Sequence, residues 1–268
     1  MNLQGKTALI TGASRGIGRA IALEFARQNL RCLILVARNT ERLAEVAAEV
    51  EALGSYAVVL PLDLTRPVEV NVAVAHAWRN HGPIDLLVNC AGVSHQTPFL
   101  QSRLPHVQSE IATNVLGLYT MTRLIARRMA AYRQGHIINV SSLMGKVAAP
   151  TMATYSATKF AILGFSQALR GELAPYNVRV TTLLPSLTDT DMVREFRWFR
   201  GVQPMTSEQV AKALVQGLRW GNPEILVGWQ THLAVLCGRL APSLLEQIVQ
   251  WAAPSPRVEK TLRMQKTF

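Results

Sequence analysis

The chain has 268 residues, of which 49% are apolar and only 17% are charged. This composition excludes a disordered chain, because disorder requires low hydrophobicity and high charge. Lysine and arginine number 28 against 17 acidic residues, a net charge of +11, and most of the arginines stand singly on helical patterns. That spacing favours a solvated surface over a nucleic-acid site, so we expect one folded domain over residues 1–268 and no nucleic-acid partner.

The cysteines and the hydropathy indicate the compartment. Cys32, Cys90 and Cys237 are odd in number and far apart, which argues against a disulfide framework or a zinc ribbon. No run of about 18 apolar residues predicts a transmembrane helix. A strand pattern starts at Thr7, so we expect no secretory leader. These features predict a soluble cytoplasmic protein without a bound metal.

Short aliphatic runs alternate with helical patterns along the chain. Apolar residues recur every four positions from Ile17 to Phe25, and further helices are expected at Glu41–Leu53, Val68–Trp78, Pro105–Tyr132 and Ala153–Leu173. The strand-like runs are continuous rather than alternating, which is typical of parallel strands buried on both faces. The pattern predicts an α/β fold with a doubly wound parallel sheet of about seven strands and helices on both faces. The expected strands are Thr7–Ile10, Cys32–Val36, Tyr56–Leu62, Ile84–Val88, His136–Val140, Val178–Leu184 and Ile225–Val227.

The turn after the first strand, Thr11–Gly18, is rich in glycine and leads into a helix. Gly12 suits a tight turn, Gly16 lets the backbone approach a phosphate, and Gly18 lets the helix pack on the sheet. The backbone amides at such a helix start bind anions. The turn therefore predicts a dinucleotide-binding site.

The end of the second strand predicts which nicotinamide cofactor binds. An acidic residue there would bond the 2′-hydroxyl of NAD, but this sequence has Ala37 and Arg38. Arg15 lies in the glycine turn, and two guanidinium groups suit a 2′-phosphate. The alternative is that both are ordinary surface arginines. We expect NADPH to be preferred over NADH.

Four polar residues stand near the expected carboxyl edge of the sheet. Tyr155 and Lys159 are four residues apart and so share one helical face, Ser142 follows the fifth strand, and Asn114 lies after the fourth. Each has an ordinary structural explanation when taken alone. Together, in this order and with the glycine turn, they resemble the short-chain dehydrogenase/reductase family over about residues 5–227.

The resemblance implies a Rossmann-type fold and a catalytic set of Asn114, Ser142, Tyr155 and Lys159. Asp63 matches the family's acid beside the adenine, and Asn89–Gly92 matches its turn after the fourth strand. Pro185–Thr190 resembles the segment that contacts the nicotinamide. The cofactor-binding residues it implies are Gly12, Ser14, Arg15, Ile17, Arg38, Asp63, Leu64, Asn89, Ala91, Gly92, Tyr155, Lys159, Pro185, Leu187 and Thr190.

The family implies a role for each catalytic residue. Tyr155 gives a proton to the carbonyl oxygen, Ser142 orients that oxygen, Lys159 holds the cofactor ribose, and Asn114 supports a water leading to bulk solvent. A phenol has a pKa near 10, and we expect the Lys159 ammonium to lower it. No acidic residue lies between Glu110 and Glu172. This basic stretch either favours phenolate and shifts the pH optimum or simply solubilises its helices.

Two segments stand outside the core pattern. Residues 187–209 resemble the family's substrate lid, with Phe196, Trp198 and Phe199 as an apolar wall and Leu143, Met144 and His95 as further expected lining. Residues 230–268 form an apolar-rich extension, which would cap the cleft, join subunits or lie on a membrane, the first two being favoured. By analogy with the family we expect a homodimer.

The leading functional prediction is an NADPH-dependent oxidoreductase that reduces a ketone or aldehyde on a small apolar body, reversibly. One enzymatic alternative is reduction of 3-oxoacyl thioesters in lipid synthesis. A second alternative is a non-catalytic NADP-binding module, although neither Tyr155 nor Lys159 is missing. A third is a lipid-surface protein that uses the basic-aromatic lid and the apolar extension.

Overall fold

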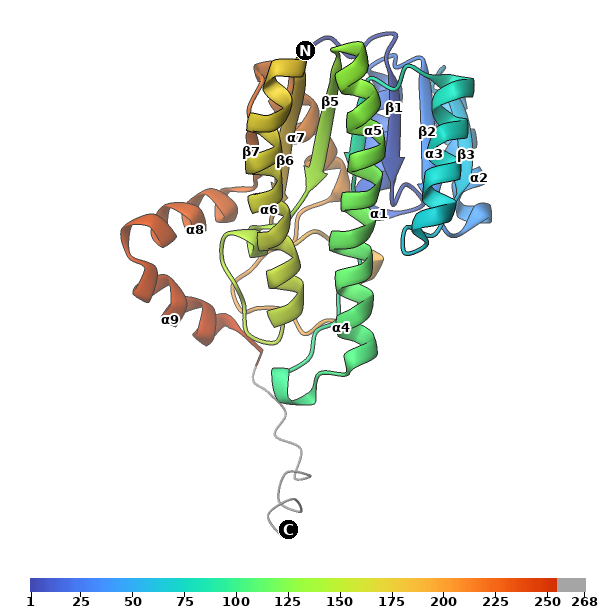
Figure 1. The fold of residues 1–268 in the computed structure, drawn as a ribbon. Helices are drawn as coiled ribbons and strands as arrows, with labels where there is room; N and C mark the ends of the chain where they lie inside the picture. Colours follow the sequence, from blue (N-terminus) through green and yellow to red (C-terminus); the bar gives the residue numbers. More distant parts are fainter. Residues whose placement is uncertain (255–268) are drawn as a thin grey trace.

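One seven-stranded sheet, parallel throughout, forms the centre of the computed structural model, which describes residues 1–254 (Figure 1). The strand order is β3-β2-β1-β4-β5-β6-β7, so the predicted doubly wound parallel sheet is confirmed. Each observed strand overlaps an expected one, and no end differs by more than two residues. The strands are β1 (Thr7–Thr11), β2 (Cys32–Ala37), β3 (Tyr56–Pro61), β4 (Leu86–Asn89), β5 (Gly135–Val140), β6 (Val178–Pro185) and β7 (Glu224–Val227).

Helices cover both faces of this sheet because its aliphatic side chains point to both sides. One face carries α1 and α7, which pack on each other, and α2 beside α1; the other carries α3, α5 and α6 (Figure 1). Two separate groups of buried side chains fill the two layers. The helices of these layers are α1 (Gly16–Arg27), α2 (Thr40–Ala52), α3 (Pro67–His81), α5 (Leu118–Tyr132), α6 (Ala153–Leu173) and α7 (Ser207–Trp220).

The long helical region expected over about Pro105–Tyr132 is confirmed, and a π-helical turn interrupts it. The segment consists of α4 (Leu104–Ile111), the π-turn η2 (Ala112–Gly117) and α5. Inside the π-turn, Asn114 Oδ1 accepts from Val93 N and Nδ2 donates to Val93 O, at 2.8 and 2.9 Å. Gly117 lies so close to Leu64 that a Cβ atom would stand 2.9 Å from the Leu64 Cβ. These contacts hold the extra residue of the turn in place, and π-turns of this kind occur often at functional sites.

Because the strands are parallel, their carboxyl ends all lie at one edge of the sheet. The strand order reverses between β1 and β4. Open α/β sheets bind ligands at this edge, because the connections there diverge and leave a crevice. Short 3₁₀ turns lie along the same edge or near it: η1 (Phe99–Gln101), η3 (Leu143–Gly145) and η5 (Asp191–Val193), whereas η4 (Ala174–Tyr176) follows α6. The residues expected to be functional therefore gather at one end of the sheet.

The last two described helices, α8 (Trp229–Leu240) and α9 (Pro242–Ala252), form a hairpin that projects beside the sheet (Figure 1). They carry most of the extension predicted for residues 230–268, whose final part, from residue 255, lies outside the described residues. Within residues 1–254, no helix combines the length and the apolar character needed to cross a membrane.

Candidate functional site

The glycine turn between β1 and α1 is held against the start of the loop after β4. Gly12 has φ +70°, and a Cβ atom on it would lie 2.8 Å from the Ala91 Cα. A Cβ on Gly18 would overlap the Gly12 carbonyl. Thr11 Oγ1 accepts hydrogen bonds from Cys90 N and Ala91 N at 3.0 and 3.1 Å. The two loops are therefore close-packed and leave room only for glycine at these positions.

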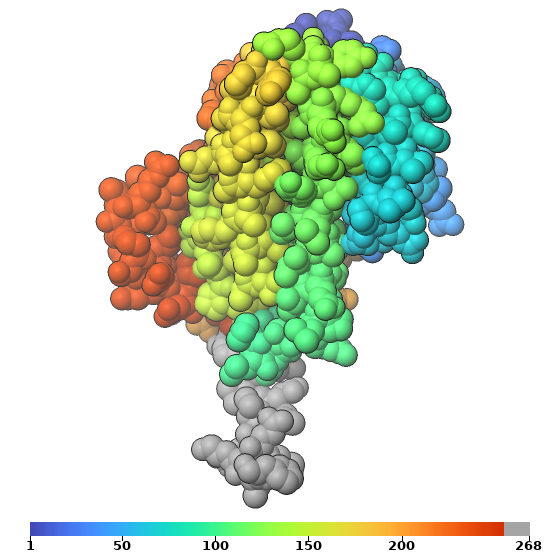
Figure 2. All heavy atoms as spheres, viewed as in Figure 1, coloured from blue at the N-terminus to red at the C-terminus, as the bar shows by residue number. Residues whose placement is uncertain are grey.

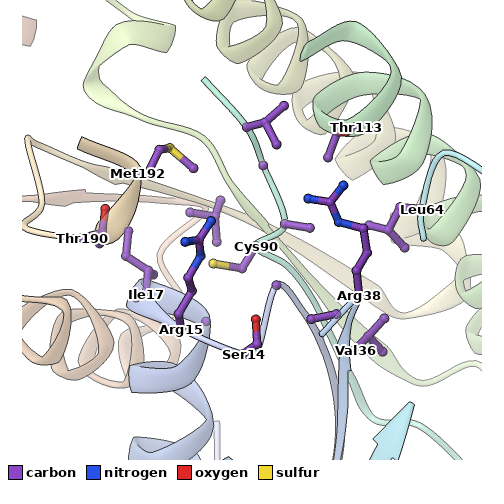
Figure 3. Close-up of a pocket in the computed structure, with 18 of the residues that line it drawn as sticks. Ser14, Arg15, Ile17, Val36, Arg38, Leu64, Cys90, Thr113, Thr190 and Met192 are labelled. Carbon is purple, nitrogen blue, oxygen red and sulfur yellow. The ribbon is translucent and has the colours of Figure 1, made fainter. Parts of the chain in front are cut away.

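A cavity opens above this turn and is rich in arginine (Figure 3). Arg15 and Arg38 extend into it, as expected for a site that takes a phosphate, and Arg42 from the first turn of α2 joins them. Arg42 was not among the residues predicted to bind the cofactor. The sequence feature that could have indicated Arg42 is its position three residues after the N-cap Asn39, because the start of a helix already favours an anion.

Asp191 connects three arginines at the rim of this cavity. Its carboxylate lies 3.3 Å from Arg15 Nη1, 3.5 Å from Arg42 Nη1 and 2.9 Å from Arg194 Nη2. Arg194 is three-quarters exposed, so these ion pairs are largely screened by water. They nevertheless join the predicted lid, residues 187–209, to the glycine turn and to α2.

Most of the expected cofactor residues line this arginine-bearing cavity. Burial alone would raise the pKa of Asp63, but hydrogen bonds from Thr65 and the charges of Arg38 and Arg66 bring it below its ordinary value, so the carboxylate is ionised. The cavity is lined by Gly12, Ser14, Arg15, Ile17, Arg38, Asp63, Leu64, Ala91, Gly92, Tyr155, Lys159 and Thr190.

Three expected residues lie elsewhere. Asn89 is buried, and its Nδ2 donates to Thr122 Oγ1 and Asn139 Oδ1 at 2.8 Å each, so its side chain joins β4 to β5 and α5 instead of lining a cavity. Pro185 and Leu187 line a second cavity, described below. The three therefore differ in position from the other predicted cofactor residues.

Tyr155 and Lys159 come together as the helical spacing predicts. The Lys159 Nζ lies 5.4 Å from the centre of the Tyr155 ring and donates to the Val140 carbonyl at 3.1 Å. Ser142 is hydrogen-bonded to Tyr155, and its Oγ also accepts from Met144 N. The neighbouring Ser141 donates instead to the Lys159 carbonyl. Ser142, not Ser141, thus faces the phenol.

The pKa of Tyr155 differs from the sequence-based expectation. Burial raises it to about 12, which outweighs the lowering effect of the Ser142 hydrogen bond, and the charges of Glu110 and Cys90 raise it further. Burial also lowers the pKa of Lys159 to about 8. The expected lowering of the phenol's pKa is therefore not found, because burial has the largest effect on each group and disfavours its charged form. At neutral pH the phenol keeps its proton.

A second cavity meets the first at Tyr155. Its lining is predominantly apolar and includes Leu143, Met144, Phe196, Trp198 and Phe199, all expected from the sequence. Tyr155, Ser141, Ile17, Thr190 and Met192 line both cavities. The phenol therefore lies at the junction between a basic space and an apolar one.

His95 was expected in the apolar lining, and that expectation is wrong. Its ring stacks on His106 with the ring centres 4.1 Å apart, and its Nδ1 lies 3.2 Å from Glu110 Oε1. Glu110 is only 1% exposed, and its Oε2 has no hydrogen-bond partner among the described residues. Burial raises the pKa of Glu110, opposed by hydrogen bonds from His95. A buried carboxyl group on α4 thus helps to raise the pKa of Tyr155.

Replacing Glu110 with glutamine should lower the pKa of Tyr155, because it removes a negative charge that raises this pKa while keeping the shape and the oxygen acceptor for His95. Reduction needs the protonated phenol, so its rate should begin to fall at a lower pH in the variant. Alcohol oxidation needs the phenolate and should rise at a lower pH. We expect the pH profiles of both reduction and oxidation to move by less than about one pH unit, the size of an ordinary effect of a single charge on a pKa.

The measurement is the pH dependence of kcat in both directions. Glu45→Gln, which removes the same charge from an exposed position on α2, is the matched control and should leave both profiles in place. An unchanged Glu110→Gln profile, or a displacement to higher pH, contradicts the assigned effect.

Known proteins with similar sequences belong to the family that the residues of this site indicate. The family model described as short chain dehydrogenase matches residues 6–200. A 3-oxoacyl-[acyl-carrier-protein] reductase from Synechocystis is 31% identical over 87% of this chain and 90% of its own length. A 3-dehydrosphinganine reductase from Danio rerio is 34% identical, covering 89% of this chain and 76% of its own.

Solved structures agree as well. A short chain dehydrogenase from Burkholderia cenocepacia, solved in complex with NADP, superposes with a TM-score of 0.83 at 28% identity, covering 95% of this chain and all of that one. The resemblance stated from Tyr155, Lys159, Ser142 and the glycine turn is thus confirmed by an independent family match over most of the chain. The chain belongs to the short-chain dehydrogenase/reductase family of oxidoreductases.

Proposed function

We propose that this chain is an NADPH-dependent reductase of a ketone or aldehyde group carried on an apolar body, acting reversibly. The observation that carries the proposal is that Tyr155 lines both the arginine-bearing cavity and the apolar cavity. A cofactor in the first and a substrate in the second would both reach the phenol. The predicted catalytic set of Asn114, Ser142, Tyr155 and Lys159 is retained in this proposal.

The first cavity fits a dinucleotide with a 2′-phosphate. Gly12 and Gly18 have no side chains to cover the backbone near the start of α1. Arg15, Arg38 and Arg42 supply positive charge to the same cavity. The related Burkholderia structure contains NADP, which supports this choice. When bound, NADPH supplies a hydride to the carbonyl carbon.

The chain's own residues then handle the proton. Tyr155, protonated at neutral pH, donates its phenolic proton to the carbonyl oxygen as negative charge develops there. Ser142 donates to the same oxygen and fixes its position. The Lys159 ammonium stabilises the phenolate that is left. Asn114, buried and bonded to Val93 and Thr158, holds the π-turn beside Lys159 and is a positioning residue.

A 3-oxoacyl thioester is the second candidate substrate. It is favoured by the 3-oxoacyl reductase among the relatives and by the apolar cavity, which suits an acyl chain. An NADPH-oxidation assay across aldehydes, ketones and 3-oxoacyl thioesters of increasing chain length separates the two. For an acyl substrate, kcat/KM should rise by up to about fourfold per added methylene, since burying each contributes about 0.8 kcal/mol.

No dependence on chain length, with good activity on compact ketones, would favour the general carbonyl reductase. Activity confined to small polar carbonyls would contradict both candidates, because the apolar cavity would then contribute nothing to binding.

The organisation of the molecule follows the same proposal. Residues 1–268 form one dinucleotide-binding and catalytic domain, with residues 187–209 as the substrate lid and residues 230–268 as the extension. The exposed side chains of Leu116, Tyr119 and Phe160 on η2, α5 and α6 support a homodimer through these helices. The three cysteines are free thiols, which is in keeping with a cytoplasmic protein.

A further inference from the structure

The hairpin of α8 and α9 exposes many large apolar side chains to solvent. On α8, Trp229, Leu233, Leu236 and Leu240 are each at least half exposed. Their spacing of four, three and four residues places them on one helical face. On α9, Leu244, Ile248 and Trp251 repeat the pattern and are also exposed. We call these seven residues the apolar stripe.

The hairpin is firmly held, so this exposure is not that of a loose end. Thr231 Oγ1 donates to the Val227 carbonyl at 2.8 Å, and Arg200 N donates to the Ala252 carbonyl at 2.8 Å. A Cβ on Gly238 would lie 3.2 Å from the Leu245 side chain, so the two helices are closely packed. Figure 2 shows the hairpin as a lobe standing out from the body. The apolar stripe therefore has a fixed shape.

Charge around the hairpin favours an anionic partner. Within residues 229–252 the only ionised groups are Arg239 and Glu246, and Glu246 lines a groove against α6 instead of joining the stripe. The sequence that follows, residues 255–268, carries Arg257, Lys260, Arg263 and Lys266 against Glu259 alone. The net charge of +11 attracts the chain to an anionic membrane.

We propose that the α8–α9 hairpin docks this protein on the surface of a membrane containing anionic phospholipids, with the apolar stripe in the headgroup region. Amphipathic helices bind in this way through buried apolar area together with attraction to anionic lipid. Trp229 and Trp251 are of the residue type enriched at membrane interfaces.

The proposed membrane-binding hairpin also contributes to the lining of the apolar cavity. Val249 on α9 lines the apolar cavity together with the lid residues Arg197 and Trp198, whereas its neighbour Ile248 is exposed. Helix α9 thus presents apolar side chains both to the proposed membrane surface and to the cavity. An apolar carbonyl compound dissolved in the bilayer would enter the cavity beside this helix.

Vesicle flotation with the full-length protein tests the proposal. The protein should float with phosphatidylglycerol-containing vesicles, much less with pure phosphatidylcholine, and less as salt increases. Joint Leu236→Asp and Leu240→Asp substitution should reduce the bound fraction about tenfold or more. Val68→Asp with Val72→Asp, also four residues apart and exposed, on α3, is the matched control and should float like the original.

Two further readouts keep this test separate from the enzymatic proposal. NADPH binding, followed by cofactor fluorescence, and activity on a short water-soluble carbonyl compound should be unchanged in the hairpin variant. Equal flotation of the hairpin variant and the original overturns the proposal, as does no flotation at all. A native mass that falls only in the hairpin variant would assign the stripe to contact between copies, which also overturns it.

Discussion

Replacing Tyr155 with phenylalanine should reduce kcat for carbonyl reduction by about 10²- to 10⁴-fold, the range that a positioned general acid contributes. The substitution removes the phenolic hydroxyl, which belongs to a residue that lines both cavities, while the ring that Lys159 overlies is kept. Burial holds the pKa of this phenol at about 12, so it is protonated and able to donate at neutral pH.

Binding of NADPH should change little in the Tyr155→Phe variant, because the arginines and the glycine turn remain. Steady-state kinetics and fluorescence titration of the cofactor measure the two effects separately. Tyr176→Phe, which removes a hydroxyl from an exposed position on η4, is the matched control and should retain full activity. Turnover within tenfold of the original would show that another group delivers the proton.

Replacing Arg38 with aspartate should reverse the cofactor preference. A charge-assisted hydrogen bond contributes about 1.5–3 kcal/mol, so its loss alone should lower kcat/KM for NADPH by roughly 10- to 100-fold. The new carboxylate repels the 2′-phosphate and offers an acceptor to the 2′-hydroxyl of NADH. Together these effects should change the ratio of kcat/KM for the two cofactors by about 100-fold or more.

Arg79→Asp makes the same charge change on an exposed part of α3 and should leave the ratio unaltered. Because Arg15 and Arg42 also pair with Asp191, their replacement disturbs the lid as well as the cofactor, so Arg38 gives the cleaner result. A protein that already prefers NADH, or a variant with an unchanged ratio, would contradict the role given to Arg38.

Most strands were predictable because they contain continuous aliphatic runs, and such runs have few alternatives to a parallel sheet buried on both faces. The glycine turn was predictable because Gly12 and Gly18 tolerate no Cβ. The division of the helix at Asn114 was not predictable from periodicity. It depends on hydrogen bonds to Val93, which is distant in sequence and reaches the π-turn only through the fold.

The environment of Tyr155 was also not predictable from the sequence. A spacing of four residues predicts that Lys159 lies beside Tyr155, but not that burial raises the pKa of Tyr155 and lowers that of Lys159. Nor does the pattern of charges along the chain identify Glu110, rather than the basic residues that follow it, as the charged side chain that acts on the phenol. Both effects depend on which side chains the fold removes from water.

Transfer of deuterium to a carbonyl substrate from NADPH that carries two deuterium atoms at C4 tests the central claim most directly. Mass spectrometry of the alcohol formed from a 3-oxoacyl thioester or an apolar ketone should find one deuterium on the carbinol carbon for each NADPH consumed. The Tyr155→Phe variant should bind the cofactor and form almost no labelled alcohol. Tight NADPH binding without oxidation on any carbonyl tested would contradict the account and identify the chain as a cofactor-binding module.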